Sequence, residues 1–204
     1  MTTQWLHWVK QLHAIGKIGL EYSDNEYDRE RYEQILAIAS EITENHTDHT
    51  QETIIDVFNH ESGYITPKVD VRGIIFKGNQ VLLVKEREDG KWTVPGGWAD
   101  VGLTPSENVV KEIEEESGYQ AKVLRLLAVY DRDKQGHKPP LAFHVYKLFF
   151  LCEITGGHAQ DSHETSDVRF FSLDNLPELS VGRVMAHQLH HFYSIQDTSV
   201  TEID

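Results

Sequence analysis

The segment of residues 96–119 constrains the fold of this chain more than any other part of its sequence. Glycines punctuate its first half, which predicts a loop, and its second half carries a full set of local signals for one helix. Thr104 can cap the amino end, Pro105 suits the first helical position, and Glu107 lies where a capping box needs a carboxylate. Gly118 can adopt the left-handed conformation that ends a helix. The sequence therefore predicts a glycine-rich loop and then one helix that begins at Thr104 and ends just before Gly118.

This predicted helix carries three glutamates on one side. Glu112, Glu115 and Glu116 are spaced i, i+3 and i+4, and at 100° per residue they fall within about 100° of arc. Like charges at this spacing repel one another by roughly 0.2–0.5 kcal/mol per pair, and carboxylates near the carboxyl end also oppose the helix dipole. A solvated acidic face is one interpretation. The other is a site for Mg²⁺ or Mn²⁺, since both ions favour hard oxygen ligands, with Glu114 pointing away as a surface residue.

The same segment resembles the Nudix box. That signature has a glycine, five residues, a glutamate and seven residues, and then Arg-Glu, an aliphatic residue, any residue, Glu-Glu, any residue, a glycine and a hydrophobic residue. The positions that match are Gly97, Glu112, Ile113, Glu115, Glu116, Gly118 and Tyr119. The resemblance extends over residues 67–192. With its N-terminal helices, the whole chain is similar to the bacterial Nudix group that acts on ADP-ribose or CDP-choline.

The resemblance implies a reaction and the residues that carry it. The implied reaction is metal-dependent hydrolysis of the pyrophosphate bond in a nucleoside diphosphate linked to another group, since cations on the phosphates neutralise charge and activate water. The implied ligands of Mg²⁺ or Mn²⁺ are Glu112, Glu115, Glu116 and the carbonyl of Gly97. A carboxylate must also accept the proton of the water. Glu116 and Glu164, which lies in a later loop, are both candidates for this base, and Glu115 is a further catalytic residue.

Two positions depart from the box. Leu103 stands where the first glutamate belongs, and Lys111 stands where the arginine belongs. In the family, those two side chains form an ion pair that braces the loop against the helix. Because small misplacements of a catalytic loop lower the rate steeply, the resemblance predicts that Leu103→Glu raises kcat and that adding Lys111→Arg raises it further. The competing hypothesis is that Leu103 packs on apolar neighbours and that the loop is already ordered.

Five other residues are expected to bind substrate: Arg72, Lys85, Trp98, Arg132 and His144. Arg72 interrupts an otherwise apolar strand, and Arg132 belongs to a polar segment, residues 131–140, that could close over a substrate. Each has a simpler interpretation as well. The first two can be surface charges, Trp98 can pack within its loop, the polar segment can be a plain connection between strands, and His144 can be a hydrogen-bonded structural histidine.

The chain changes texture near residue 67, which predicts an N-terminal helical module with a linker at residues 1–66 and a Nudix domain at residues 67–204. Apolar residues recur at helical spacing in residues 5–20 and 35–42, and a short helix-like piece is expected at residues 54–58. The second part has the alternation and turns of an α+β domain, which the resemblance makes a Nudix fold, a mixed β-sheet sandwiched between helices. Strands are expected at residues 69–76, 81–84, 121–130, 143–154 and 168–173, a last helix at residues 181–192, and a loose tail from Ser194.

Composition narrows the function classes. The formal net charge of −14 repels phosphate backbones, so no stable nucleic-acid partner is expected, and local cations must offset this charge for an anionic substrate. No apolar stretch approaches the ~20 residues that span a bilayer, and the N-terminus lacks the features of a signal peptide. The single cysteine, Cys152, is expected to be a small core residue. These features predict a cytoplasmic protein.

The N-terminal helices need a partner for their apolar faces. A hairpin of about 45 residues has little core of its own, which predicts a homodimer through Trp5, Val9, Leu12, Ile35 and Ile38, or else docking on the catalytic domain.

Two further functions stay open beside the hydrolase. One is a Nudix enzyme that acts on RNA ends or short RNA, and the other is a non-catalytic Nudix-fold nucleotide sensor.

Overall fold

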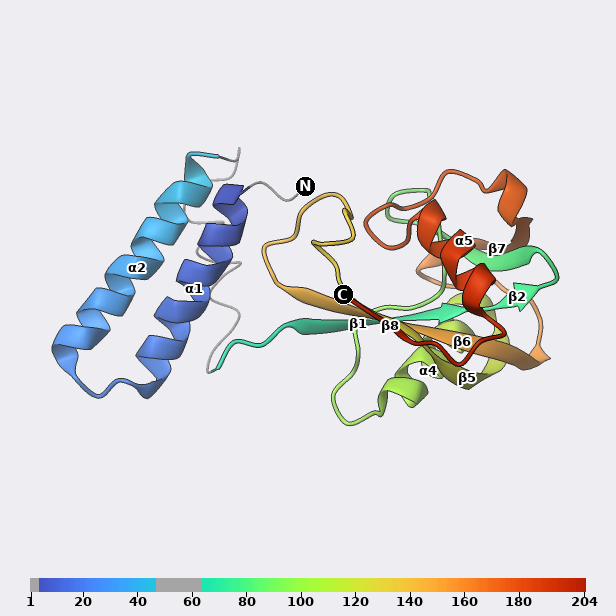
Figure 1. Ribbon diagram of the computed structural model, residues 1–204, viewed down its shortest axis with the longest axis horizontal. Coiled ribbons are helices and arrows are strands. Elements are labelled where there is room, and N and C mark those ends of the chain that lie inside the picture. The colour runs from blue at the N-terminus through green and yellow to red at the C-terminus, as the bar shows by residue number, and fades with distance from the viewer. Residues whose placement is uncertain (1–3, 47–63) are drawn as a thin grey trace. The chain divides into compact units, whose positions relative to one another are not determined.

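A computed structural model describes residues 4–46 and 64–204 of the chain. The helix-like piece expected at residues 54–58 lies outside the described residues. The chain divides into two compact units (Figure 1): one comprises residues 1–67 and 140–144, and the other comprises residues 68–139 and 145–204. No helix among the described residues is long and apolar enough to cross a membrane.

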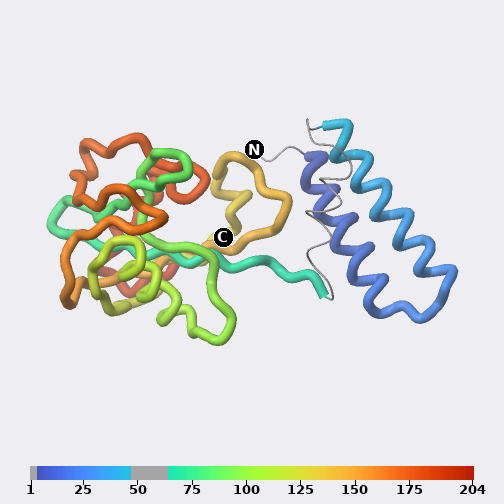
Figure 2. The backbone as a smooth tube through the Cα atoms, turned by 180° about the vertical axis from the view of Figure 1, so that it is seen from behind, coloured from blue at the N-terminus to red at the C-terminus, as the bar shows by residue number. Residues whose placement is uncertain are grey.

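The first unit contains the two helices that the apolar periodicity predicts. Helix α1 spans Gln4–Tyr22 and helix α2 spans Glu26–Glu44, and the two run side by side (Figure 2). The Asn25 side chain accepts a hydrogen bond from the backbone N–H of Tyr27 at 2.9 Å and so caps α2. Val9 and Ala39 form the buried centre of the hairpin, with Trp5, Leu12 and Ile42 packed against them. Three of the five residues expected at a dimer contact, Trp5, Val9 and Leu12, therefore pack within the hairpin itself.

The second unit contains two sheets, and one of them is the mixed sheet that the resemblance implies. The first sheet is mixed, because β1 pairs parallel with β6 while β6 and β5 are antiparallel, and its order is β1-β6-β5-β8. The second sheet is antiparallel, and its strands β2, β4 and β7 all pair with β3. The strands are β1 Lys68–Ile74, β2 Phe76–Lys77, β3 Gln80–Glu86, β4 Trp92–Thr93, β5 Tyr119–Asp131, β6 Val145–Gly157, β7 Thr165–Ser172 and β8 Glu202–Ile203.

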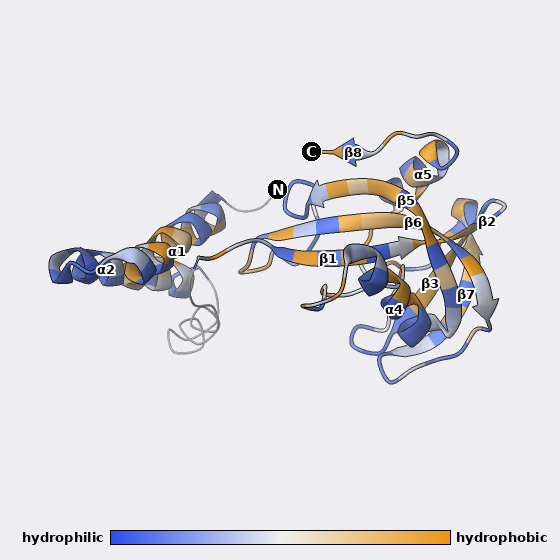
Figure 3. Ribbon diagram, turned by 90° about the horizontal axis from the view of Figure 1, so that it is seen from below, coloured by the Kyte–Doolittle hydropathy of each residue, from blue (hydrophilic) through white to orange (hydrophobic). Residues whose placement is uncertain are grey.

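Two helices cover this unit from opposite sides (Figure 3). Helix α4, Pro105–Ser117, packs Val109 and Ile113 into one core, which also holds Cys152, buried as expected. Helix α5, Ala186–Ile195, contributes to a second core, and a 3-10 turn at Leu173–Asn175 precedes it. Strand β3 alternates its side chains between these cores and is apolar on both faces, whereas β1 contributes Val71 to one core and Ile74 to the other and also buries Asp70 and Arg72.

Three expectations from the sequence are wrong in detail. The last helix begins at Ala186, not at residue 181. The tail is not loose, because β8 pairs with β5 and the Asp204 carboxylate accepts a hydrogen bond from the backbone N–H of Asp131. His144 lies just before β6 rather than within a strand.

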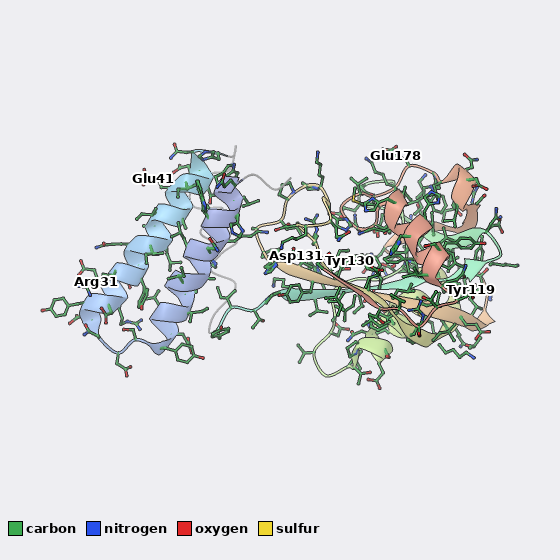
Figure 4. The ribbon with its side chains drawn as sticks, viewed as in Figure 1. Arg31, Glu41, Tyr119, Tyr130, Asp131 and Glu178 are labelled. Atoms are coloured by element: carbon green, nitrogen blue, oxygen red, sulfur yellow. The ribbon has the colours of Figure 1, made fainter. Side chains whose placement is uncertain are left out.

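Tyr119 and the Tyr130–Asp131 pair lie toward opposite ends of β5 (Figure 4).

Candidate active site

Helix α4 begins and ends as its local sequence predicts. Thr104 Oγ1 accepts from the backbone N–H of Glu107 at 3.3 Å, and the Glu107 carboxylate accepts from the backbone N–H of Thr104 at 2.8 Å. This reciprocal pair is a complete capping box. At the other end, Gly118 has a φ of 72°. The helix therefore has fixed ends, which fixes the direction of each glutamate on it.

The glutamates of α4 differ in burial. Glu116 is 4% exposed, Glu112 is half-buried, and Glu115 and Glu114 are exposed. Ile113 and Val109 pack into the core and set the rotation of the helix about its axis. Because burial of Ile113 turns Glu112 and Glu116 toward the domain, those two carboxylates lose solvent while Glu114 keeps it.

The glycine loop before α4 is bound to strand β1. The backbone N–H of Val71 donates to the Gly97 carbonyl at 2.9 Å, and the backbone N–H of Gly96 donates to Glu116 Oε2 at 2.9 Å. Gly96 has a φ of 142°, and a Cβ on it would lie 2.0 Å from the Val71 carbonyl oxygen. A Cβ on Gly97 would lie 3.0 Å from Glu112 Oε2. Both glycines therefore permit a close approach between the loop, β1 and the carboxylates of α4.

Burial dominates the electrostatics of these carboxylates. It raises the pKa of Glu116 to about 8, although the positive charge of Arg72 and the hydrogen bond from Gly96 work in the other direction. Burial also raises the pKa of Glu112, helped by the charges of Glu115 and Glu164 and opposed by Lys111 and Arg72. The structure thus brings Glu112 and Glu116 together with too little positive charge nearby to neutralise both carboxylates.

Glu86, at the end of β3, is a further buried carboxylate that the sequence analysis did not single out. Burial raises its pKa, and its charge in turn raises the pKa of Glu116. It forms an ion pair of 3.1 Å with Arg183. Its position one residue after Lys85, in an apolar strand, was the available signal, because a carboxylate that ends a buried strand faces the domain interior as often as solvent.

The loop that carries Glu164 is fixed by its backbone. The Glu164 carbonyl accepts from the backbone N–H of Arg87 at 2.8 Å, and the backbone N–H of Glu164 donates to Ser162 Oγ at 3.1 Å. The next residue, Thr165, is buried and donates from Oγ1 to the Glu116 carbonyl at 2.6 Å. The Glu164 side chain stays exposed, with Oε1 3.1 Å from His163 Nε2. The structure therefore places Glu164 beside the end of α4, with a fixed backbone and a movable side chain.

Arg72 lies between two groups of charged side chains. One group is Glu112 and Glu116, and the other is Asp70 and Lys147. Its guanidinium donates from Nε to Asp70 Oδ1 at 2.9 Å and from Nη2 to Asp70 Oδ2 at 2.8 Å. Lys147 is the register partner of Asp70 on β6, and its Nζ donates to Asp70 Oδ1 at 2.7 Å. Although burial alone would raise the pKa of Asp70, these two cations lower it to about 2. Burial lowers the pKa of Lys147 to about 8, against the attraction of Asp70.

The other four residues expected to bind substrate come from different elements, but two of them lie near Asp70: Trp98 forms a β-bridge with it, and the charge of Arg132 interacts with it. Arg132 is 3% exposed and donates from Nη2 to the Pro139 carbonyl at 2.7 Å, so its polar segment is folded on itself. Lys85 is half-buried on β3, and Trp98 is exposed beside Asp70 in an isolated β-bridge. His144 belongs to the unit of the N-terminal helices. Arg72 is the one of the five whose charge acts directly on Glu112 and Glu116.

The donor set of this site fits a hard divalent cation. Glu116 and Glu112 are carboxylates held out of water, which is costly unless a proton or a cation neutralises them. Within residues 4–46 and 64–204 no three acidic, histidine or cysteine side chains are already gathered around one point. Glu115 instead pairs with Lys111 at 2.9 Å. Glu112 and Glu116 are thus the carboxylates best placed to hold an ion, and Glu115 would have to leave Lys111 to join them.

The chain is similar to known proteins over most of its length. A UDP-X-like, N-terminal oligomerisation domain of the Nudix type matches residues 3–58, and the NUDIX domain matches residues 66–192. The chain is 46% identical over 187 residues to YjhB of Bacillus subtilis (strain 168), named as a candidate ADP-ribose pyrophosphatase, with 92% of this chain and 89% of that protein covered. A crystal structure of an ADP-ribose pyrophosphatase from Streptococcus suis 89-1591 is 40% identical with a TM-score of 0.62, covering 68% of this chain and 100% of that one. A crystal structure of a UDP-X diphosphatase is 33% identical with a TM-score of 0.65, covering 100% of this chain and 99% of that one.

Proposed function

The chain belongs to the Nudix family, and on that premise we propose that it hydrolyses the pyrophosphate bond of a nucleoside diphosphate linked to another group, with Mg²⁺ or Mn²⁺ as cofactor. The products are a nucleoside monophosphate and the phosphorylated second group. The names of its relatives favour ADP-ribose or a UDP-linked compound as substrate, and the CDP-choline type implied by the sequence resemblance stays in the same class. The single buried cysteine fits a reducing compartment such as the cytoplasm.

One observation carries the proposal: the Glu116 carboxylate is buried where the glycine loop meets α4, and this burial raises its pKa to about 8. A buried carboxylate with such a pKa is protonated at neutral pH unless a cation replaces the proton. Glu112 lies on the same face of α4 and its pKa is raised as well. A polyanionic substrate needs positive charge in a chain of net charge −14, and a divalent cation on these carboxylates supplies it.

Different residues of the site have different roles in the proposed reaction. When bound, the divalent cation withdraws charge from the pyrophosphate and makes a water molecule more acidic. Glu112 and Glu116 would hold the cation, joined by Glu115 and by the Gly97 carbonyl, whose second lone pair is free of the hydrogen bond from Val71. The backbone N–H of Gly96 holds Glu116 Oε2 and so fixes the direction of that carboxylate. Arg72 adds positive charge beside the same group.

Glu164 is the proposed acceptor of the proton from water. Its carboxylate is exposed and movable, while its backbone is fixed beside α4. Glu116, the other candidate, is buried, and one of its oxygens already accepts the Gly96 N–H. Glu164→Gln should therefore lower kcat while leaving the affinity for Mn²⁺ unchanged, whereas Glu116→Gln should lower both. Weaker Mn²⁺ binding by Glu164→Gln would assign Glu164 to the cation instead.

A substrate panel tests the proposed function. ADP-ribose, CDP-choline, a UDP-linked sugar and a short capped RNA are each incubated with the full chain in Mg²⁺, in Mn²⁺ and in excess EDTA, and the products are separated by chromatography. We expect a nucleoside monophosphate from at least one of the small substrates and none in EDTA. Release of product from RNA alone would favour the RNA-end enzyme. Binding of a nucleotide without turnover in either metal would favour the sensor.

We also propose that the helical unit joins two copies of the chain. The match of residues 3–58 to an oligomerisation domain supports this, as do the exposed apolar residues of its helices. Trp8 is 50% exposed and Ile15 52% exposed on α1, and Ile38 is 51% exposed on α2. Light scattering at micromolar concentration should give about twice the chain mass of 23.4 kDa. Trp8→Glu with Ile15→Glu should give the single mass, and the exposed Ile203→Glu in the other unit serves as the control.

A further inference from the structure

The second half of the glycine loop, residues 100–104, is fixed to α4 by side chains that the Nudix box does not specify. The first half is held by β1, through the hydrogen bond from Val71 to the Gly97 carbonyl and from the backbone N–H of Ala99 to the Val69 carbonyl at 2.9 Å. In the second half the box would place a glutamate at Leu103, and that position holds an apolar side chain that is 39% exposed. Something else must therefore hold this half of the loop.

Asn108 is the main contact. Its side chain is buried on the first turns of α4, where it can accept and donate at once. Its Oδ1 accepts from the backbone N–H of Asp100 at 2.7 Å, and its Nδ2 lies 3.3 Å from each of the carbonyl oxygens of Asp100, Leu103 and Thr104. A buried amide whose donor and acceptor both face one loop fixes both ends of that loop relative to the helix.

Asp100 supplies the second contact. Its Oδ2 accepts from Lys111 Nζ at 3.1 Å, and the same ammonium donates to Glu115 Oε2 at 2.9 Å. Lys111 thus links a carboxylate of the loop to one of the glutamates expected to hold the cation. In the Nudix box, the ion pair joins a glutamate at position 103 to the basic residue at position 111. In this chain the partner of Lys111 is Asp100, three positions before Leu103.

We propose that Asp100 and Asn108 are the positioning residues of this active site, and that the Asp100–Lys111 pair takes the place of the glutamate–arginine pair that the box specifies. The proposal rests on the proposed hydrolase function, since the loop it orders carries Gly96 and Gly97. It also revises the sequence-based expectation for Leu103. With the loop already held by another pair, Leu103→Glu alone should leave kcat unchanged.

The first test measures loop order without substrate. Hydrogen–deuterium exchange of the metal-free full chain is followed at the amides of residues 98–104. Asp100→Asn removes the charge and keeps the size, and Glu153→Gln, which breaks the comparably exposed surface pair Lys122–Glu153 of 2.9 Å, is the matched control. We expect faster exchange in this loop for Asp100→Asn and no change there for Glu153→Gln. Equal exchange in the two variants would overturn the proposal, whether or not a substrate has been found.

The second test measures catalysis with a rescue. Asp100→Asn should lower kcat by about 10-fold with a smaller change in KM, because a displaced loop affects the reacting geometry more than ground-state binding. Adding Leu103→Glu should restore most of this loss, since the new glutamate can then pair with Lys111. Asn108→Ala should lower kcat at least as far, and because it can also impair folding, Asp100→Asn with its rescue decides the outcome. If Leu103→Glu raises kcat in the otherwise unaltered chain, or fails to rescue Asp100→Asn, the Asp100–Lys111 pair does not take the place of the pair that the box specifies.

Discussion

Two groups of buried charges meet at Arg72, and they are compensated to different degrees. On one side, Asp70 accepts three hydrogen bonds from Arg72 and Lys147, and its pKa falls to about 2. On the other side, Glu116 accepts a hydrogen bond from the Gly96 backbone N–H, and its pKa rises to about 8. Both carboxylates are buried to a similar extent, with exposed fractions of 6% and 4%. Burial therefore does not distinguish them, but the supply of cations does.

The difference separates a structural ion cluster from a site that requires a ligand. A carboxylate that finds its cations within the chain contributes to folding and leaves nothing to bind. A carboxylate that is buried without a cation lowers stability until a proton or a metal ion neutralises it. Perturbed pKa values of this second kind concentrate at functional sites.

Asp70→Asn should have the largest effect, and the effect should be on folding. Removing this carboxylate leaves Arg72 and Lys147 buried without their anion, so we expect the free energy of unfolding to fall by about 3–5 kcal/mol. Urea denaturation measures this change, with Glu153→Gln on the surface as a control that should change it by about 1 kcal/mol or less. A loss as small as that of the control would mean that water or another anion already neutralises these cations.

Glu116→Gln should act on catalysis and leave folding intact. Loss of this carboxylate should lower kcat by at least ~10²-fold, the range seen when a charge-stabilising or acid–base group is removed. Because the substitution also removes a buried carboxyl group whose ionisation Arg72 compensates only in part, the metal-free protein should be no less stable than the original chain. Steady-state kinetics and denaturation in EDTA give the two numbers. A loss of stability comparable to that of Asp70→Asn would place both carboxylates in one structural cluster.

The two groups should give stability that depends on pH with opposite signs. The pKa of Glu116 rises from 4.5 to about 8 on folding, so the folded protein retains an extra proton between those values. In EDTA, stability should therefore fall as pH rises from about 4.5 to about 8, by on the order of 5 kcal/mol. The pKa of Asp70 falls from 3.8 to about 2, so its contribution is present above pH 3.8 and is lost as pH falls through about 2. Denaturation midpoints across this range, with and without Glu116→Gln, isolate the first effect, and an unchanged slope in Glu116→Gln would contradict it.

The sequence predicts α4 and its glutamates because their determinants are local. Thr104, Glu107 and Gly118 fix the ends of the helix within a few residues of the chain, and the spacing of Val109 and Ile113 fixes its rotation. The same holds for the two N-terminal helices, whose apolar periodicity is confirmed. A resemblance over a long, spaced signature then identifies the family without any knowledge of the tertiary contacts.

The sequence does not predict the compensation of the buried charges, because it depends on strand register. Asp70 and Lys147 are 77 residues apart and meet only because β1 and β6 pair in parallel at those positions. Arg72 was singled out as an interruption of an apolar strand, but its partner two residues earlier was not. For the loop before α4, the contacts of Asp100 and Asn108 are close in sequence, but the box specifies neither residue, so the resemblance does not predict them.

Glu114→Gln should have the smallest effect, and it tests whether position on α4 or charge alone matters. Glu114 lies between Glu112 and Glu115 in sequence, but its side chain is exposed and its described contact is a 3.4 Å hydrogen bond from Gln120 Nε2. An exposed carboxylate keeps its water, needs no cation and lies outside the proposed site, so kcat should stay within about 2-fold and stability within about 0.5 kcal/mol. The same kinetic and urea measurements apply. A loss in kcat close to that of Glu116→Gln would mean that the net acidity of the helix, and not the burial of two of its glutamates, attracts the cation.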